Sequence, residues 1–346
     1  MSDINLGLCC INTILRDKNI FCSRTVRLET FKNKGMSHLS TLIRQNLNDL
    51  ITMIEWNYLN NINLMRISSD IFPHKSNPNA PKYDLDEFQE LLSAAGTLSR
   101  KYGQRLTFHP GQYNVVGTPN PESFANTILD LDWHAEVLDR MECGSDSVIV
   151  VHGGGTYGNK ILTRERWIEQ FYKLPERVQR RLVLENCEKN FNIEDCLYIS
   201  NTTLVPVVFD THHYDCYNIL HPQDNLRPAE EYIPAILDTW HRRGIKPKFH
   251  VSEQRENSQI GAHSDYITKL PDYLMKLKNI DIMIEAKMKE QAIFKLRNTI
   301  NPIKIYKRPV AILPTSQGSV PCCGFLSPPP PPHKITLRPK AIKIES

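Results

Sequence analysis

Short runs of β-branched and other apolar residues alternate with longer, amphipathic segments along the first 300 residues. Runs of this length, separated by segments of helical periodicity, are typical of strands buried between helices. Within the longer segments apolar residues recur at steps of three and four, which predicts helices over 39–59, 85–102, 121–141, 228–242, 266–277 and 287–298. The eight predicted strands are residues 4–9, 64–67, 105–109, 147–152, 182–185, 206–210, 247–251 and 280–285.

Repeated strand–helix units predict a parallel sheet, and eight of them predict an α/β fold of the (β/α)8 TIM barrel type. An open, doubly wound sheet is the competing architecture, but it would normally carry a Gly-x-Gly-x-x-Gly loop after its first strand. The chain has no such loop there, and its run of three glycines, 153–155, follows the fourth predicted strand, where it predicts a tight turn. We therefore expect one barrel domain over residues 1–300, ending at the Asn301-Pro302 step.

Residues 301–346 differ from the rest in composition, because they hold 10 of the 23 prolines. Such a segment cannot form regular helices, so we expect a disordered, Pro-rich basic C-terminal tail. A solvated extension is the simpler interpretation, although the five consecutive prolines 328–332 also fit a docking motif for a protein partner. Seven of the 42 Lys and Arg residues but one of the 38 Asp and Glu residues lie in this tail, which leaves the barrel nearly neutral. Net charge therefore does not indicate nucleic-acid binding, which would need local patches, metal ions or the tail.

The composition otherwise indicates an intracellular globular protein. Hydrophobic residues make up 40% and charged residues 23%, which excludes a mostly disordered or a fibrous chain. No apolar run approaches the roughly 20 residues of a membrane span, and the start of the chain lacks the pattern of a secretory signal. The nine cysteines include no Cys-x-x-Cys pair, which argues against a zinc ribbon or a disulfide framework. We expect a monomer of the cytoplasm or nucleus, without a membrane partner.

Metal-binding side chains stand at the ends of six predicted strands, from the third to the eighth. The carboxyl ends of the strands form the rim on which barrel enzymes place their active sites. Alone, each residue would more often be a hydrogen-bonded structural histidine or a helix N-cap, but their joint placement predicts one shared site. Two further imidazoles follow the sixth and seventh strands. The strand-end residues are His109, His152, Glu185, Asp210, His250 and Glu285, and the two that follow are His213 and His263.

Five imidazoles and three carboxylates are too many ligands for one ion, so we expect two or three divalent ions held close together. Mixed nitrogen and oxygen donors favour Mn²⁺, with Zn²⁺ possible, over Mg²⁺. Clustered divalent ions stabilise the attacking and leaving oxygens of a phosphodiester and make hydroxide from water. The predicted chemistry is therefore phosphodiester hydrolysis.

Lys248 is predicted to lie on the same inward face of its strand as His250, two residues further on. A free ammonium beside several divalent cations would be repelled. Two interpretations stay open from the sequence. Either the side chain is turned away or paired with a carboxylate, or it is neutralised, for example by carboxylation into a further metal ligand.

Seven motifs, in this order along the chain, resemble those of the UV damage endonuclease family. The resemblance covers most of the chain, to about residue 292, and its most specific parts are the His-Pro-Gly-Gln-Tyr and Asp-Thr-x-His-His strings. The motifs are Phe108-His109-Pro110-Gly111-Gln112-Tyr113, Val151-His152-Gly153-Gly154, Leu184-Glu185-Asn186, Asp210-Thr211-His212-His213, Lys248-Phe249-His250, Gly261-Ala262-His263 and Ile284-Glu285-Ala286-Lys287.

The resemblance implies a barrel whose metal cluster, usually manganese, incises double-stranded DNA immediately 5′ to a lesion and leaves a 3′-hydroxyl. It implies cyclobutane pyrimidine dimers, (6-4) photoproducts and abasic sites as substrates. Gln112 and Tyr113 match residues that probe the duplex at the damage, and Asn12 and Arg66 fall at positions for DNA contacts. The implied catalytic residues are Glu185, Glu285 and Lys248, and the implied metal ligands are His109, His152, Glu185, Asp210, His213, His250, His263 and Glu285.

One position departs from the family, which often has a tyrosine where this chain has Leu8. Loss of a stacking ring would alter lesion preference, since base stacking on an aromatic contributes roughly 1–3 kcal/mol. Two rival functions stay open: a metal-dependent sugar isomerase or epimerase on a related barrel, and a non-catalytic damage-binding protein. The first needs fewer imidazoles, and the second predicts missing ligands, whereas all eight are present.

Overall fold

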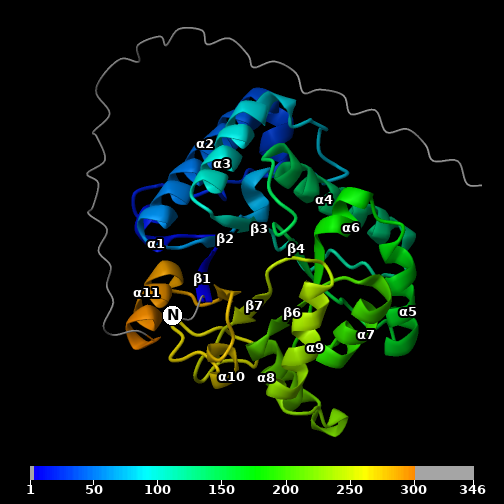
Figure 1. Cartoon of the computed structure of the whole chain (residues 1–346). Coiled ribbons are helices and arrows are strands. Elements are labelled where there is room, and N and C mark those ends of the chain that lie inside the picture. Colours follow the sequence, from blue (N-terminus) through cyan, green and yellow to red (C-terminus); the bar gives the residue numbers. More distant parts are fainter. Residues whose placement is uncertain (1–3, 301–346) are drawn as a thin grey trace, which may run out of the picture. The chain divides into compact units, whose positions relative to one another are not determined.

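The computed structural model describes residues 4–300, in which eight parallel strands form a nearly closed barrel surrounded by helices (Figure 1). All eight predicted strands are present, and the predicted barrel is confirmed. The tail predicted over residues 301–346 lies outside the described residues. The strands are β1 (Ile4–Cys9), β2 (Leu64–Arg66), β3 (Arg105–Thr107), β4 (Ile149–His152), β5 (Leu182–Glu185), β6 (Val207–Asp210), β7 (Lys248–Val251) and β8 (Ile280–Ile284).

The strands are hydrogen-bonded in the order β3-β2-β1-β8-β7-β6-β5-β4, so the two ends of the sheet are β3 and β4. Just beyond β3, a parallel bridge pairs Phe108 with Ile149 and closes the barrel. The Phe108 amide donates to the Val148 carbonyl at 3.0 Å, and the Val150 amide donates to the Phe108 carbonyl at 3.0 Å. Among the described strands, the seam between β3 and β4 is therefore joined by a single bridge, whereas the other junctions have two or more residue pairs.

The helices begin near the carboxyl ends of the strands and return along the outside of the barrel (Figure 1). The segment predicted as helix over 39–59 is the longer part of α2, which is interrupted at Gly35, where φ is 73°. Within residues 4–300, every helix is too short or too polar to span a lipid bilayer. The α-helices are α1 (Thr13–Arg16), α2 (Leu28–Leu59), α3 (Gln89–Lys101), α4 (Pro121–Arg140), α5 (Lys160–Phe171), α6 (Glu176–Arg181), α7 (Ile193–Thr203), α8 (Thr211–Leu220), α9 (Ala229–His241), α10 (Asp272–Met275) and α11 (Lys289–Ile300).

The prediction of a helix over 266–277 is wrong for most of that segment, because α10 spans Asp272–Met275 alone. Pro271 sits at the start of this helix, and a proline disfavours helical conformation in the residue before it. The apolar residues whose spacing suggested a helix are buried although the segment is irregular, as Ile267 and Leu270 show.

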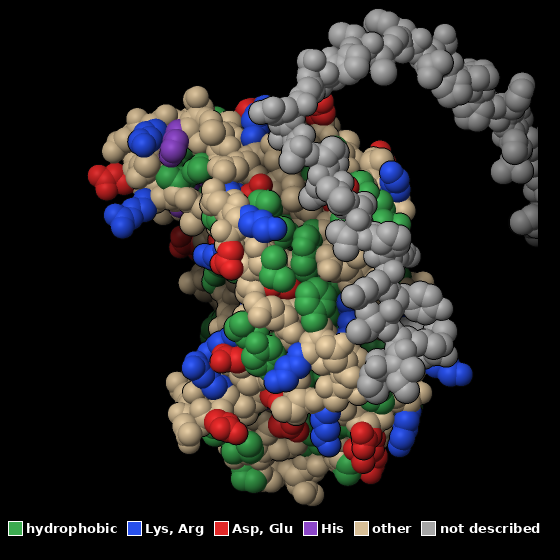
Figure 2. Space-filling model, turned by 90° about the vertical axis from the view of Figure 1, so that its left-hand side faces the viewer, with side chains coloured by type: hydrophobic (Ala, Val, Ile, Leu, Met, Phe, Trp, Pro, Cys, Tyr) green, Lys and Arg blue, Asp and Glu red, His purple; other side chains and the backbone are tan. Residues whose placement is uncertain are grey.

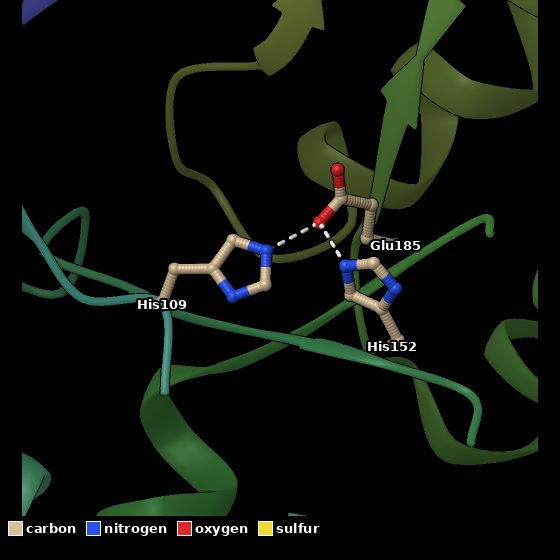
Figure 3. A group of neighbouring side chains, drawn as sticks. All are labelled: His109, His152 and Glu185. Atoms are coloured by element: carbon tan, nitrogen blue, oxygen red, sulfur yellow. Dashed lines mark hydrogen bonds and ion pairs between the residues drawn. The ribbon is translucent and has the colours of Figure 1, made fainter. Parts of the chain in front are cut away.

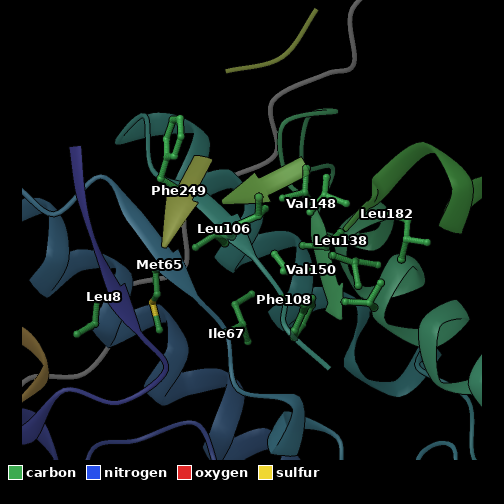
Figure 4. Packing of buried hydrophobic residues seen from close by; sticks show 14 of the residues in the cluster. Leu8, Met65, Ile67, Leu106, Phe108, Leu138, Val148, Val150, Leu182 and Phe249 are labelled. Atoms are coloured by element: carbon green, nitrogen blue, oxygen red, sulfur yellow. The ribbon is translucent and has the colours of Figure 1, made fainter. Parts of the chain in front are cut away.

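The hydrophobic core joins side chains of the strands to those of the surrounding helices, and Figure 4 shows a part of it. Phe108 and Val150, on the two sides of the closing seam, are both fully buried in it, as is Leu138 of α4. Leu8, at the family's usual tyrosine position, is also fully buried and pairs with Met65 of β2. Its side chain therefore packs in the core.

A buried ion pair ties the strands together near their amino ends. Asp281 of β8 is buried, and its Oδ2 lies 2.9 Å from Nη1 of Arg105 on β3. Its Oδ1 lies 2.6 Å from Nζ of Lys246 and accepts a hydrogen bond from Nδ2 of Asn5 at 3.0 Å. One carboxylate thus bridges β1, β3 and the segment before β7.

We expect Asp281→Ala to lower the free energy of unfolding by about 3–5 kcal/mol, because it leaves Arg105 buried without its partner. Urea denaturation followed by circular dichroism would measure the loss. The matched control is Asp238→Ala, whose carboxylate is 65% exposed and pairs with Arg242 at 3.0 Å. This surface pair should contribute less than about 1 kcal/mol, and equal losses in the two variants would contradict the prediction.

Candidate metal centre

Glu185, at the carboxyl end of β5, is fully buried and is surrounded by imidazoles. Its Oε2 lies 2.8 Å from Nε2 of His109 and 3.3 Å from Nε2 of His152, so the two rings converge on one oxygen (Figure 3). Its Oε1 lies 2.7 Å from Nδ1 of His250 and 3.6 Å from Nδ1 of His213. Burial alone would raise the pKa of Glu185, but the imidazoles outweigh burial and hold the pKa well below its usual range.

Glu285 follows β8 and joins this group through His250. Its Oε1 lies 3.2 Å from Nδ1 of His250 and 2.7 Å from Nη1 of Arg66, and its Oε2 lies 3.9 Å from Nδ1 of His263. Burial opposes ionisation of Glu285, yet Arg66 and His250 keep its pKa well below the usual range. His263 is the most exposed of the predicted ligands and lies at the edge of the group.

Asp210 ends β6 and caps α8, and only one of its two carboxylate oxygens is used in doing so. Oδ1 accepts hydrogen bonds from the amides of His212 and His213 at 2.8 and 2.9 Å. Oδ2 is buried and has no hydrogen-bond partner among the described residues. Burial raises the pKa of Asp210, and the nearby Glu185 adds to the effect. A buried oxygen without a donor, beside a second carboxylate, is a site that a cation would stabilise.

The donor set fits a bound divalent metal ion. Ligand atoms of His109, His152 and Glu185 lie within 4.8 Å of one another, and so do those of Glu185, Asp210 and His213. Burial lowers the pKa of His109 to about 4, which keeps the imidazole in the neutral form that binds metals. The structure therefore brings together the residues that the sequence predicted as ligands, with candidate groups centred on Glu185.

Asn186 fixes the orientation of His213 from the neighbouring strand. The Asn186 carbonyl lies 3.0 Å from Nδ1 of His213, and a carbonyl only accepts, so Nδ1 carries the proton. The Asn186 side chain also accepts from the Asp210 amide at 2.8 Å and donates to its carbonyl at 3.0 Å, which locks β5 to β6 at the rim.

Lys248 is fully buried inside the barrel, next to His250. The first interpretation of the sequence had this side chain turned away or paired with a carboxylate. In the structure it points inward, and no carboxylate among residues 4–300 lies within ion-pair distance of it. Burial, aided by Arg66, lowers its pKa to about 7, so a large share of the amine is neutral near that pH.

The predicted DNA-contacting residues divide into exposed and buried ones. Gln112 and Tyr113 lie in the loop after β3 and are exposed, Tyr113 by 68%. Asn12 is fully buried, and its Oδ1 caps α1 by accepting from the Leu15 amide at 2.9 Å. Arg66 is engaged by Glu285 inside the barrel. The structure thus presents the first pair to solvent and holds the second pair inward.

The glycines after β4 lie in an irregular part of the loop to α5, whose turn is at residues 157–158 and not at the predicted 153–155. They let two rim loops approach each other. Gly154 has a φ of 90°, and a Cβ there would lie 2.3 Å from Cγ1 of Val115 in the loop after β3. The loops that follow His109 and His152 can therefore lie against each other.

Sequence reasoning missed two rim residues. Glu188, in the loop after β5, has a ligand atom within 4.8 Å of those of His152 and His213. Tyr157, in the loop after β4, is 50% exposed. Both follow closely after a strand that ends in a predicted ligand, and that position in the sequence was the signal that could have found them.

Comparison with known proteins supports the same fold and identifies the family of the chain. The sequence pattern of the family described as UV-endonuclease UvdE matches residues 4–312. A protein of Acanthamoeba polyphaga mimivirus, provisionally named UV-damage endonuclease, is 37% identical over 302 residues, which cover 85% of this chain and 90% of that protein. The UV-damage endonuclease of Schizosaccharomyces pombe is 38% identical over 304 residues, 84% of this chain, which spans 50% of that relative's length. The crystal structure of SacUVDE matches with a TM-score of 0.77 at 28% identity, over 86% of this chain and 98% of that one.

We expect Glu185→Gln to lose bound Mn²⁺, because the substitution removes the charge on which both candidate groups converge. Equilibrium dialysis followed by elemental analysis would count the ions per chain, and far-UV circular dichroism would confirm that the barrel is folded. Glu169→Gln, an exposed residue of α5, is the matched control and should bind like the native protein. Native metal content in Glu185→Gln would show that the centre lies elsewhere.

Proposed function

Because the chain belongs to the UV-endonuclease UvdE family, we propose that it is a metal-dependent DNA repair endonuclease. It incises double-stranded DNA immediately 5′ to cyclobutane pyrimidine dimers, (6-4) photoproducts and abasic sites, and leaves a 3′-hydroxyl. The observation that carries the proposal is the Glu185 centre: one buried carboxylate with four imidazoles around it, on the rim of a barrel.

In this proposal, the side chains around Glu185 hold two or three divalent ions, Mn²⁺ before Zn²⁺. Bound ions would lower the pKa of a water and stabilise charge on the attacking and leaving oxygens of the phosphodiester. Glu185, Asp210 and Glu285 supply the negative charge that lets cations lie close together. Arg66 holds Glu285 in place, and Lys248, neutral or carboxylated, completes the inner wall beside His250.

Recognition is assigned to the exposed loop after β3. A ring and an amide on this loop can enter a duplex where a lesion has already weakened stacking and pairing, so damaged sites are the easiest to open. Tyr113 and Gln112 are the side chains that the loop offers. Asn12 and Arg66 stay predictions as DNA contacts, because in this structure they cap a helix and pair with Glu285.

Net charge contributes little to this recognition. On the face shown in Figure 2, acidic and basic side chains are interspersed, in keeping with a nearly neutral barrel. Affinity for DNA would then come from local contacts at the rim and from bound cations.

The position of incision tests the proposed function directly. A 5′-labelled duplex with a single thymine dimer, incubated with the protein and Mn²⁺, should give one product that ends immediately 5′ of the dimer. A polymerase should extend that product, because it ends in a 3′-hydroxyl. The undamaged duplex and a reaction with EDTA are the controls. A mobility shift without cleavage would point instead to a damage-binding protein, and cleavage at another position would refute the proposed polarity.

We expect the double variant Gln112→Ala, Tyr113→Ala to keep its metal content but to lose preference for damaged over intact DNA. Loss of one stacking contact should cost roughly 1–3 kcal/mol in kcat/KM for the thymine-dimer duplex. The control is Tyr172→Ala, a 56% exposed tyrosine at the far end of α5, away from the strand carboxyl ends. Unchanged kcat/KM in the double variant would end the assignment of a probing role to this loop.

A further inference from the structure

Two adjacent cysteines lie at the carboxyl end of β1, Cys9 as its last residue and Cys10 just beyond it. The Ile11 amide donates to the Cys9 carbonyl at 2.7 Å, and the φ of Cys10 is 62°. A three-residue turn of this kind, with a positive φ at its centre, is a rare and strained γ-turn. Strained backbone at residues other than glycine clusters at functional sites.

The turn allows both sulfurs to reach one guanidinium. Successive residues of a regular strand point to opposite faces of the sheet, so two adjacent side chains would otherwise point apart. Nη2 of Arg66, on β2, donates to Sγ of Cys9, and Arg66 also hydrogen-bonds the Cys10 side chain. Nη1 of the same guanidinium lies 2.7 Å from Oε1 of Glu285. Arg66 therefore joins the thiol pair to a carboxylate of the metal centre.

The two thiols differ in exposure and in ionisation. Cys9 is 3% exposed, whereas Cys10 is partly exposed. A hydrogen bond from the Cys9 thiol, helped by Arg66, outweighs burial and lowers the pKa of Cys10 to about 6. The same hydrogen bond, together with burial, raises the pKa of Cys9 well above its usual value. The other titratable groups that face the pair are Cys22, which acts on Cys10, and Glu285, which acts on Cys9. At neutral pH Cys10 is therefore the thiolate, and Cys9 keeps its proton.

This combination distinguishes the pair from the other cysteines of residues 4–300. Four of these have a pKa raised by burial, and the fifth, Cys187, is buried and hydrogen-bonded to His152. A thiolate beside a guanidinium, partly open to solvent and next to a second thiol, is the arrangement of cysteines that respond to oxidants. The four cysteines with a raised pKa are Cys22, Cys143, Cys196 and Cys216.

We propose that Cys10 is a site of reversible oxidation by hydroperoxides and that Cys9 is its resolving cysteine. The Cys10 thiolate attacks one oxygen of the peroxide, the O–O bond breaks, and the other oxygen takes up a proton and leaves as water or an alcohol. Cys10 is then a sulfenic acid. Cys9 loses its proton and attacks the sulfenic sulfur, so that an S–S bond forms and the S–O bond breaks to release water. The two sulfurs together lose two electrons, which the peroxide gains.

The product would be easily reversed. Adjacent Cα atoms are about 3.8 Å apart, closer than the roughly 4.4–6.8 Å that is usual in a disulfide. A bond between Cys9 and Cys10 is therefore strained, and a dithiol reduces it readily. In the oxidised form Arg66 faces no thiolate and keeps Glu285 as its anionic partner. Neither step uses DNA or a bound metal ion, so this inference does not depend on the proposed function.

The pH dependence of alkylation tests the thiolate. Trypsin cleaves after Arg16, so residues 1–16 form a peptide whose only cysteines are Cys9 and Cys10. In the full chain, the rate at which iodoacetamide modifies Cys10, read from this peptide by tandem mass spectrometry, should be half-maximal at about pH 6 and level at higher pH. A synthetic peptide of residues 1–16 has the same adjacent cysteines without Arg66, so its midpoint should lie at roughly pH 8.5. Equal midpoints in the full chain and the peptide would overturn the inference.

Peroxide treatment tests the two steps separately. In the native chain, hydrogen peroxide should give a peptide 1–16 that has lost two hydrogens, and dithiothreitol should restore it. Cys9→Ser should stop at the sulfenic acid, which dimedone traps on Cys10, and Cys10→Ser should form neither product. Cys22→Ser, at a buried cysteine with a raised pKa, is the matched control and should behave like the native chain.

An unchanged Tm in each variant, followed by circular dichroism, would show that the barrel is folded. The inference is overturned if Cys10 stays reduced in peroxide, or if the oxidised product links Cys10 to Cys22 or to any cysteine other than Cys9.

Discussion

Glu185 is a carboxylate without contact to solvent, and several elements of the barrel supply the partners that it needs. An ionised carboxylate buried without partners would cost several kcal/mol, so donors have to converge on it from several elements. The loop after β3, the ends of β4 and β7 and the first turn of α8 each contribute an imidazole. The carboxyl ends of these strands must therefore lie close together on one rim. The packing that forms the barrel thus also assembles the site.

The same carboxylate also receives an imidazole from each side of the junction between β3 and β4. β3 and β4 are the two ends of the strand order, and a bridge at Phe108 closes them. His109, one residue after this bridge, and His152, at the end of β4, both reach Oε2 of Glu185 (Figure 3). The Glu185 carboxylate therefore links β3 and β4 through side chains, at a junction with a single backbone bridge. Cations bound by the same side chains would strengthen this link.

The sequence predicts the strands and their ends well, because a strand buried between helices needs an apolar run and its last residue reaches the rim. It predicts less where the outcome depends on contacts between distant segments. The Nδ1 contact of His213 is with the carbonyl of Asn186, the residue after β5, and the inward turn of Arg66 is set by Glu285. Glu188 comes near His152 and His213 through the fold alone, because the three residues belong to different strand–helix units. A single proline, Pro271, overrides the periodicity that predicted a longer helix.

The residues proposed for hydrolysis and the residues proposed for damage recognition lie in different environments on the same rim. The centre at Glu185 is buried and held from several strands, whereas Tyr113 is 68% exposed on a loop. A nearly neutral barrel cannot attract DNA by net charge, and the carboxylates of the centre would repel a phosphate unless cations covered them. On the proposed function, the ions that take part in hydrolysis therefore also make the rim able to receive the DNA backbone. Substrate binding and catalysis then depend on the same ligands, while the choice of lesion depends on the loop.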